Sequence, residues 1–239
     1  MPTIAERSDP YANFMLNPRP GPGVCRRCCT FTDGHPLCYP CHQTPQLLQA
    51  VAPISYSIDG EQLHHVLAGY KRSGGTTARR FELDLAAILW RFLANHEGCV
   101  AAAAEVDTFD RVCTVPSGDA GRDEHHPLRR IVGEIVLPTR HRFARLLTRT
   151  SKPVAPRAFD RDKYAAVDRI DDAAVLLIDD TWTTGASAQS AAGALLDAGA
   201  AVVAIVVIGR HIRLEFEDNA RRLAELPRPF DWSVCSLEG

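Results

Sequence analysis

The sequence predicts an α/β protein in which a mostly parallel sheet is flanked by helices, with a small cysteine-rich module near the N-terminus. Strand-like runs alternate with helix-like runs, and several strand-like runs are almost wholly apolar. This alternation favours a parallel sheet, and continuous apolar runs are typical of strands covered on both faces. Five of the eight cysteines fall between positions 25 and 41, which indicates the separate module.

Composition predicts three parts: an irregular N-terminal segment over 1–22, the cysteine-rich module over 23–45 and the main domain over 46–239. Hydrophobic residues make up 46% of the 239 residues, enough for one sizeable core. The net charge of −2 argues against a global field that would recruit nucleic acid. We expect no membrane span, because no apolar run approaches about 18 residues. The first ten residues lack an apolar signal core, so a cytoplasmic location is expected.

Two identical Cys-x-x-Cys pairs define the module, Cys25 with Cys28 and Cys38 with Cys41. The turn-forming residues 32–36 separate them and can fold the second pair back onto the first. Four sulfurs around one ion are the usual closure of a structural zinc site. The sequence therefore predicts a zinc ion held by these four cysteines. Such a short segment has little core of its own, so its folding should depend on the metal.

Three other residues of this region offer alternatives. Cys29 is the spare cysteine, and His35 or His42 could replace a ligand but would break the symmetry of the spacing. A redox role is also open, although a thioredoxin-type motif occurs singly within a strand–helix unit.

The main domain is predicted to alternate strands and helices. In order, the expected elements are a strand over 52–58, helices over 63–70 and 81–92, a strand over 110–116, a helix over 128–136, strands over 145–149 and 175–178, a helix over 188–196, an interior strand over 201–208 and an edge strand over 232–237. Residues 152–170 form a long polar stretch, and loops of this length are usually functional or disordered. We expect a mobile lid there.

The run 175–187 carries the strongest functional signal. Four apolar residues are followed by Asp179 and Asp180, and a Thr/Gly/Ser turn then opens a helix. Backbone N–H groups and the positive end of a helix dipole meet at such a turn and favour phosphate. Because the carboxylates would repel a phosphate, they are better suited to sugar hydroxyls or to a metal ion beside it. A sugar phosphate satisfies both halves of the motif.

This run resembles the loop with which type I phosphoribosyltransferases bind 5-phosphoribosyl-1-diphosphate (PRPP). The resemblance implies a phosphoribosyltransferase-like domain that uses magnesium with PRPP and transfers ribosyl phosphate to an acceptor, with release of pyrophosphate. It assigns Asp179 and Asp180 to the ribose and to catalysis. The PRPP-binding residues implied are Asp179, Asp180, Thr181, Thr183, Thr184, Gly185, Ala186 and Ser187. Trp182 departs from the family, which usually has a small or medium aliphatic residue there.

Together with the cysteine pairs, the Gly-Tyr-Lys-Arg-Ser-Gly segment at 69–74 and Val-Pro at 115–116 make the chain similar to the ComF family. These phosphoribosyltransferase-like proteins are linked in some bacteria to DNA uptake. The resemblance adds Ser117 and Gly118 as a pyrophosphate loop; a plain surface turn is the alternative. Lys71 could clamp the diphosphate or be a solvated helix end. The arginine-rich motif usual after Val-Pro is missing, and residues 152–170 would be a hood over the site.

Two functions stay open. The chain is either a phosphoribosyltransferase with an unidentified acceptor or a non-catalytic, PRPP-responsive or nucleic-acid-associated accessory protein of the competence type. The zinc module favours a macromolecular partner, and the basic run over 129–149 permits weak binding to nucleic acid. A solvated helix face is the alternative explanation of that run.

Overall fold

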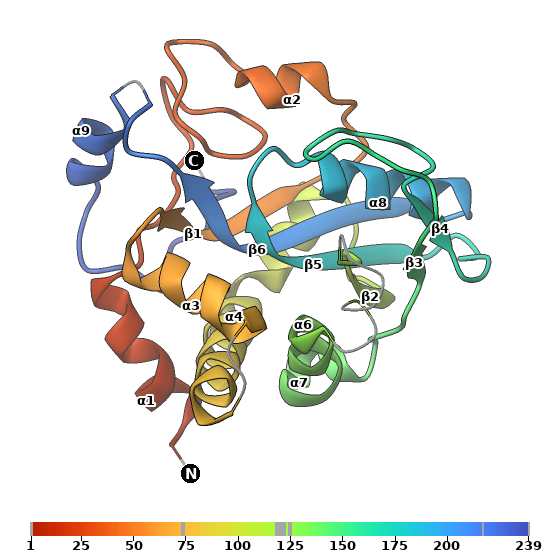
Figure 1. Ribbon diagram of the computed structural model, residues 1–239, viewed down its shortest axis with the longest axis horizontal. Helices are drawn as coiled ribbons and strands as arrows, with labels where there is room; N and C mark the ends of the chain where they lie inside the picture. Colours follow the sequence, from red (N-terminus) through yellow and green to blue (C-terminus); the bar gives the residue numbers. More distant parts are fainter. Residues whose placement is uncertain (1, 73–74, 118–122, 124–125, 217, 239) are drawn as a thin grey trace.

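A four-stranded parallel sheet forms the centre of the protein in the computed structural model, with strand order β1-β6-β5-β2 (Figure 1). The strands are β1 (Val51–Ile58), β2 (Arg111–Thr114), β5 (Ala174–Trp182) and β6 (Val202–Ile212). The structure describes residues 2–72, 75–117, 123, 126–216 and 218–238. The predicted α/β class, its parallel sheet and the interior position of the strand over 201–208 are confirmed.

Helices cover both faces of the sheet (Figure 1). The helices are α1 (Ile4–Ser8), α2 (Tyr39–Gln43), α3 (Gln62–Arg72), α4 (Thr76–Ala103), α6 (Pro127–Arg130), α7 (Leu137–Arg140), α8 (Ala186–Asp197) and α9 (Asn219–Ala224). One face carries α3, α4, α6 and α7, and the opposite face carries α8, the hairpin of β3 (Leu147–Arg149) and β4 (Tyr164–Ala166), and the cysteine module. Among the described residues, none of the helices could span a bilayer.

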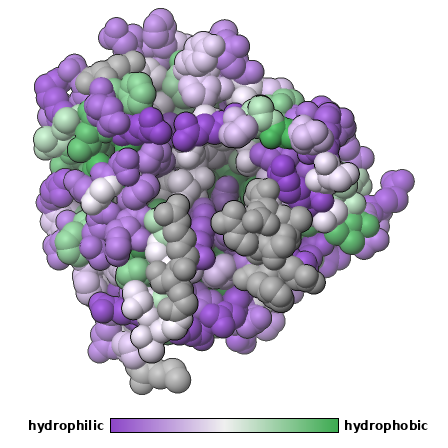
Figure 2. Space-filling view, in the orientation of Figure 1, coloured by the Kyte–Doolittle hydropathy of each residue, from purple (hydrophilic) through white to green (hydrophobic). Residues whose placement is uncertain are grey.

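Alternation along the strands explains this layering. In β5, Leu176 and Ile178 pack with α3 and α4, whereas Val175 and Leu177 pack with α8 and the cysteine module. All four side chains are fully buried, and burying each stabilises the fold by about 1.5–3 kcal/mol. The face of the protein that Figure 2 shows is mostly hydrophilic, with apolar residues in small scattered groups.

The predicted helix over 128–136 is broken into α6, a π-helical turn over Ile131–Ile135, and α7. Val136 is extended, with φ −79° and ψ 106°, and two residues later Pro138 lies in the first turn of α7. Proline lacks the N–H donor that an uninterrupted helix would need, and its ring would clash with the carbonyl four residues before it. Proline is tolerated in the first turn of a helix, so the helix restarts here. The apolar pattern survives the break, because Leu128, Ile131 and Val132 remain buried.

Three further expectations differ from the structure. Residues 4–13, predicted to be irregular, form α1 and a 3-10 turn over Asp9–Asn13, because Thr3 and Glu6 make a capping box. The stretch 152–170 contains β4, which pairs with β3 as a hairpin. The predicted edge strand over 232–237 is wrong: these residues form turns that pack on α4.

Candidate functional site

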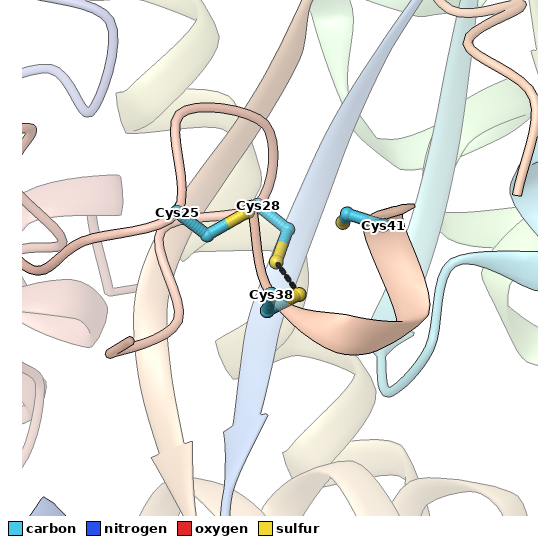
Figure 3. A group of neighbouring side chains, drawn as sticks. All are labelled: Cys25, Cys28, Cys38 and Cys41. Carbon is cyan, nitrogen blue, oxygen red and sulfur yellow. Dashed lines mark hydrogen bonds between the residues drawn. The ribbon is translucent and has the colours of Figure 1, made fainter. Parts of the chain in front are cut away.

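The four predicted cysteine ligands lie together in a buried cluster (Figure 3). Cys25 and Cys28 lie in the turn closed by the Val24–Phe31 bridge, while Cys38 precedes α2 and Cys41 lies within it. Their sulfurs are all within 4.8 Å of one another, and those of Cys28 and Cys38 are 3.7 Å apart. Zn–S bonds of about 2.3 Å place tetrahedral sulfurs about 3.8 Å apart. The cluster could therefore hold a structural zinc ion.

The charges around the cluster fit a metal tetrathiolate. Hydrogen bonding to Cys25 raises the pKa of both Cys38 and Cys41, since four adjacent sulfurs cannot all ionise without a cation. The buried guanidinium of Arg210 lies beside the cluster, and its Nε donates to the carbonyl oxygen of Cys28 at 3.1 Å. A zinc ion with four thiolates carries two negative charges, which this arginine partly balances. Cys29 lies outside the cluster, as expected of the spare cysteine.

A second site lies where β5 passes into α8. A pocket of about 160 Å³ is lined by Arg157, Asp179 and residues 181–188, so it includes most of the residues implied to bind PRPP. Gly185 starts α8 with φ +80°, a left-handed conformation that suits glycine, and it caps the helix with no side chain. The pocket is far smaller than the 300–1,000 Å³ typical of drug-sized ligands. It suits a small anionic group at the helix N-terminus.

The two aspartates differ in their surroundings. Asp180 is buried, accepts a hydrogen bond from the Tyr70 hydroxyl and forms an ion pair with Lys71 at 2.5 Å. Although burial opposes its ionisation, Lys71 and Tyr70 hold the pKa of Asp180 below its ordinary value. Asp179 faces the pocket, and burial together with the charge of Asp180 raises its pKa to about 8. The structure therefore places Asp179 in the pocket and Asp180 behind it, with Lys71.

Basic side chains from the β3–β4 hairpin lie close to the pocket. Lys163 is 7% exposed, and its Nζ donates to the hydroxyl of Ser187 at 2.7 Å. Burial lowers the pKa of Lys163, and the nearby positive charge of Arg149 lowers it further. The buried Nη1 of Arg149 has no hydrogen-bond partner in the part of the chain that the structure describes. Two cations next to a helix N-terminus favour a ligand with more than one negative charge.

Sequence patterns had given Tyr70, His126 and Arg149 no role at this site. Tyr70 follows the helical spacing of a core face, which hides its hydroxyl contact to Asp180. The ring of His126 lies edge-on to that of Tyr70, with centroids 6.1 Å apart, and burial lowers the pKa of this histidine. No spacing in the sequence links these residues to β5, because the sheet topology alone brings them together.

The predicted pyrophosphate loop is described only in part. The backbone N–H of Ser117 donates to Asp123 at 2.7 Å, and the carbonyl of Pro116 accepts a hydrogen bond from Tyr164 at 3.2 Å. This second contact ties the loop to the hairpin that carries Lys163. Gly118 lies outside the described residues.

Several cations of the basic run over 129–149 are paired with carboxylates. The pairs are Arg129 with Asp123, Arg130 with Glu82, and Arg142 with Glu97. Pairing reduces the charge that this surface can offer to a polyanion.

Comparison of the chain with models of known protein families, with curated proteins and with solved structures finds no match. The residues therefore define the class by themselves: an α/β protein with a parallel sheet, a buried four-cysteine cluster and a small anion-sized pocket at a strand-to-helix turn.

Proposed function

We propose that this chain is a PRPP-binding protein of the ComF type, with a type I phosphoribosyltransferase-like domain. The observation that carries the proposal is the contact between the buried Lys163 and Ser187, at the mouth of the pocket that the motif lines. An ammonium group held against a helix N-terminus is costly to bury without an anion. A 5-phosphate in the turn over 183–187 supplies that anion, and Asp179 lies beside it for the ribose.

The reaction proposed is transfer of the ribosyl phosphate. The bond between C1 of the ribose and the diphosphate oxygen breaks, pyrophosphate leaves with the electron pair, and the acceptor bonds to C1 and loses its proton. Magnesium, when bound with PRPP, neutralises the diphosphate. An ionised Asp179 beside the ribose would favour the positive charge that develops on the ribosyl centre, with the Asp180–Lys71 ion pair behind it.

A non-catalytic, PRPP-responsive protein is the second candidate. Asp180 is already engaged by Tyr70 and Lys71, which leaves Asp179 as the carboxylate that faces the pocket. The arginine-rich motif that usually follows Val-Pro in the resembling family is absent as well. Ligand binding without turnover is consistent with both observations.

Calorimetric titration with PRPP and magnesium tests the shared step. Lys163→Gln should weaken binding by about 10- to 150-fold, because a hydrogen bond to a charged group typically contributes about 1.5–3 kcal/mol. Arg161→Gln is the matched control, since that side chain is about half exposed and pairs with Asp197 instead. No binding by the unaltered chain at millimolar PRPP would contradict the proposal. If PRPP binds, pyrophosphate release in a screen of nucleobases, amines and nucleic-acid ends separates the enzyme from the responsive protein.

A further inference from the structure

A second group of metal-binding side chains lies outside both sites already described. His96 and Cys99 lie on α4, and Cys235 lies in the C-terminal segment 227–238. One ligand atom from each lies within 4.8 Å of the others. Cys113 is buried in β2, and Cys29 is the spare of the zinc module, so these two thiols account for the remaining cysteines.

The spacing within this group matches metal coordination. His96 and Cys99 are three positions apart on a helix and so share a face. Nδ1 of His96 lies 3.7 Å from Sγ of Cys99. Zinc bonds of about 2.3 Å to sulfur and about 2.0–2.1 Å to nitrogen place two such ligands about 3.6 Å apart at the tetrahedral angle. The pair is therefore spaced as two ligands of one ion.

A backbone contact fixes the histidine for ligation. Nε2 of His96 lies 2.8 Å from the carbonyl oxygen of Trp232, which can only accept a hydrogen bond. Nε2 therefore carries the proton, and Nδ1 turns an unprotonated lone pair toward Cys99. Histidines that bind metals commonly donate their other N–H to a carbonyl or a carboxylate in this way.

A fourth ligand is available at the surface. The carboxylate Oε1 of Glu238 lies 2.9 Å from Sγ of Cys99, and Glu238 is exposed. An ion would replace the thiol proton that now joins the two groups. Glu238 lies outside the group of three whose ligand atoms are within 4.8 Å of one another, so its exposed side chain would have to move inward to complete the site. Two sulfurs, one nitrogen and one carboxylate oxygen form a donor set typical of zinc.

We propose that His96, Cys99, Cys235 and Glu238 bind a second divalent ion of the zinc class. The ion would fasten segment 227–238 to α4 across more than a hundred positions of sequence. This segment consists of turns, yet it buries Phe230 and Cys235. A cross-link supplies the order that a segment without strand or helix pairing otherwise lacks.

Elemental analysis and cobalt substitution of the full chain test this site. We expect two zinc ions per chain in the unaltered protein and one in both Cys99→Ser and Cys235→Ser. Cys113→Ala, which removes a buried thiol elsewhere in the core, should keep two. Replacement with cobalt should give two absorption signatures, and Cys99→Ser should lose the one with fewer thiolate ligands. Glu238→Gln, an exposed change, should weaken the second site and leave the first intact.

Two results would overturn the proposal. One is that the unaltered chain binds a single zinc ion even at excess zinc and that Cys99→Ser also binds one. The other comes from titrating the thiols of the denatured protein with and without prior reduction. If the unreduced protein has two fewer thiols, and Cys99→Ser removes this deficit, a Cys99–Cys235 disulfide occupies the place of the ion.

Discussion

The cysteine module and the β5–α8 pocket both arise from short sequence motifs, but they are completed in different ways. The module draws all four sulfurs from positions 25 to 41. The pocket takes its turn from one motif, yet the contact between Tyr70 and Asp180 spans 110 positions and that between Lys163 and Ser187 spans 24. A site whose ligands are close in sequence can be predicted from their spacing. A site assembled from distant segments exists only once the sheet has formed.

Arg210 connects the two regions. Its Nε donates to the carbonyl of Cys28 and its Nη1 donates to the carbonyl of Trp182, both at 3.1 Å. Trp182 in turn packs its ring against Gly185, where α8 begins. The cysteine module therefore contacts the end of β5 through one buried guanidinium. The module and the pocket are thus connected, although one forms from a local motif and the other from distant segments.

The largest effect expected is that of Cys38→Ser. Loss of one thiolate should release the zinc of the module, and structural zinc contributes about 10–16 kcal/mol of binding free energy in zinc-finger peptides. The module should unfold, and the unfolding temperature of the whole chain should fall. Elemental analysis and thermal unfolding measure both. Cys29→Ser is the matched control and should keep that zinc, so equal zinc loss in the two variants would contradict the assignment.

Arg210→Met tests the connection itself. Removing the guanidinium leaves buried carbonyls of Cys28 and Trp182 without their donor and the four-cysteine cluster without its nearby positive charge. Leaving a buried acceptor without its donor typically costs about 1–3 kcal/mol, so two such carbonyls cost about 2–6 kcal/mol. We expect denaturant unfolding to show a loss of that size, together with weaker PRPP binding. Normal PRPP affinity in a folded Arg210→Met protein would show that the regions act separately.

Sequence reasoning recovered what depends on local pattern and missed what depends on tertiary contact. The parallel sheet, the helix after 185 and the four cysteines follow from apolar periodicity and spacing. The edge strand over 232–237 failed because a short alternating pattern cannot show that Cys235 packs against α4 instead of pairing with a strand. Arg149 gave no signal for this pocket, because an arginine at the end of a basic run has the same sequence pattern on a solvated surface and beside an anion pocket.

Gly185→Val probes the pocket alone. A Cβ built at Gly185 would lie 2.1 Å from Cζ2 of Trp182, and φ is +80°. The left-handed backbone costs a residue with a side chain about 1–2 kcal/mol, and overpacking typically adds about 1–3 kcal/mol. We expect PRPP binding to be lost while the zinc content stays unchanged, as calorimetry and elemental analysis would show. Gly34→Val, at a glycine with a similar φ of +75° and open space around its Cβ, controls for backbone strain alone.

The pH dependence of stability contributed by Asp179 tests the electrostatics of the pocket. Its folded-state pKa is raised to about 8, from an ordinary value of 3.8, so the folded protein favours the neutral carboxyl. The stability that this group contributes is full below pH about 4 and is lost as the pH rises through about 8, with a slope of at most about 1.36 kcal/mol per pH unit. The difference in unfolding free energy between the unaltered chain and Asp179→Asn should therefore decline over that window. A difference that is constant from pH 4 to 8 would contradict the raised pKa.

The same carboxyl links this pH dependence to the proposed ligand. A magnesium ion or a ribose hydroxyl beside Asp179 favours its ionised form, so binding of PRPP with magnesium at pH 7 should release a proton. Calorimetry in buffers of different ionisation enthalpy measures that proton directly. Asp179→Asn should bind with less proton release, whereas Asp197→Asn, which removes an exposed carboxylate paired with Arg161 outside the pocket, should keep it. Equal proton release in the two variants would show that Asp179 is not the group that loses the proton when the ligand binds.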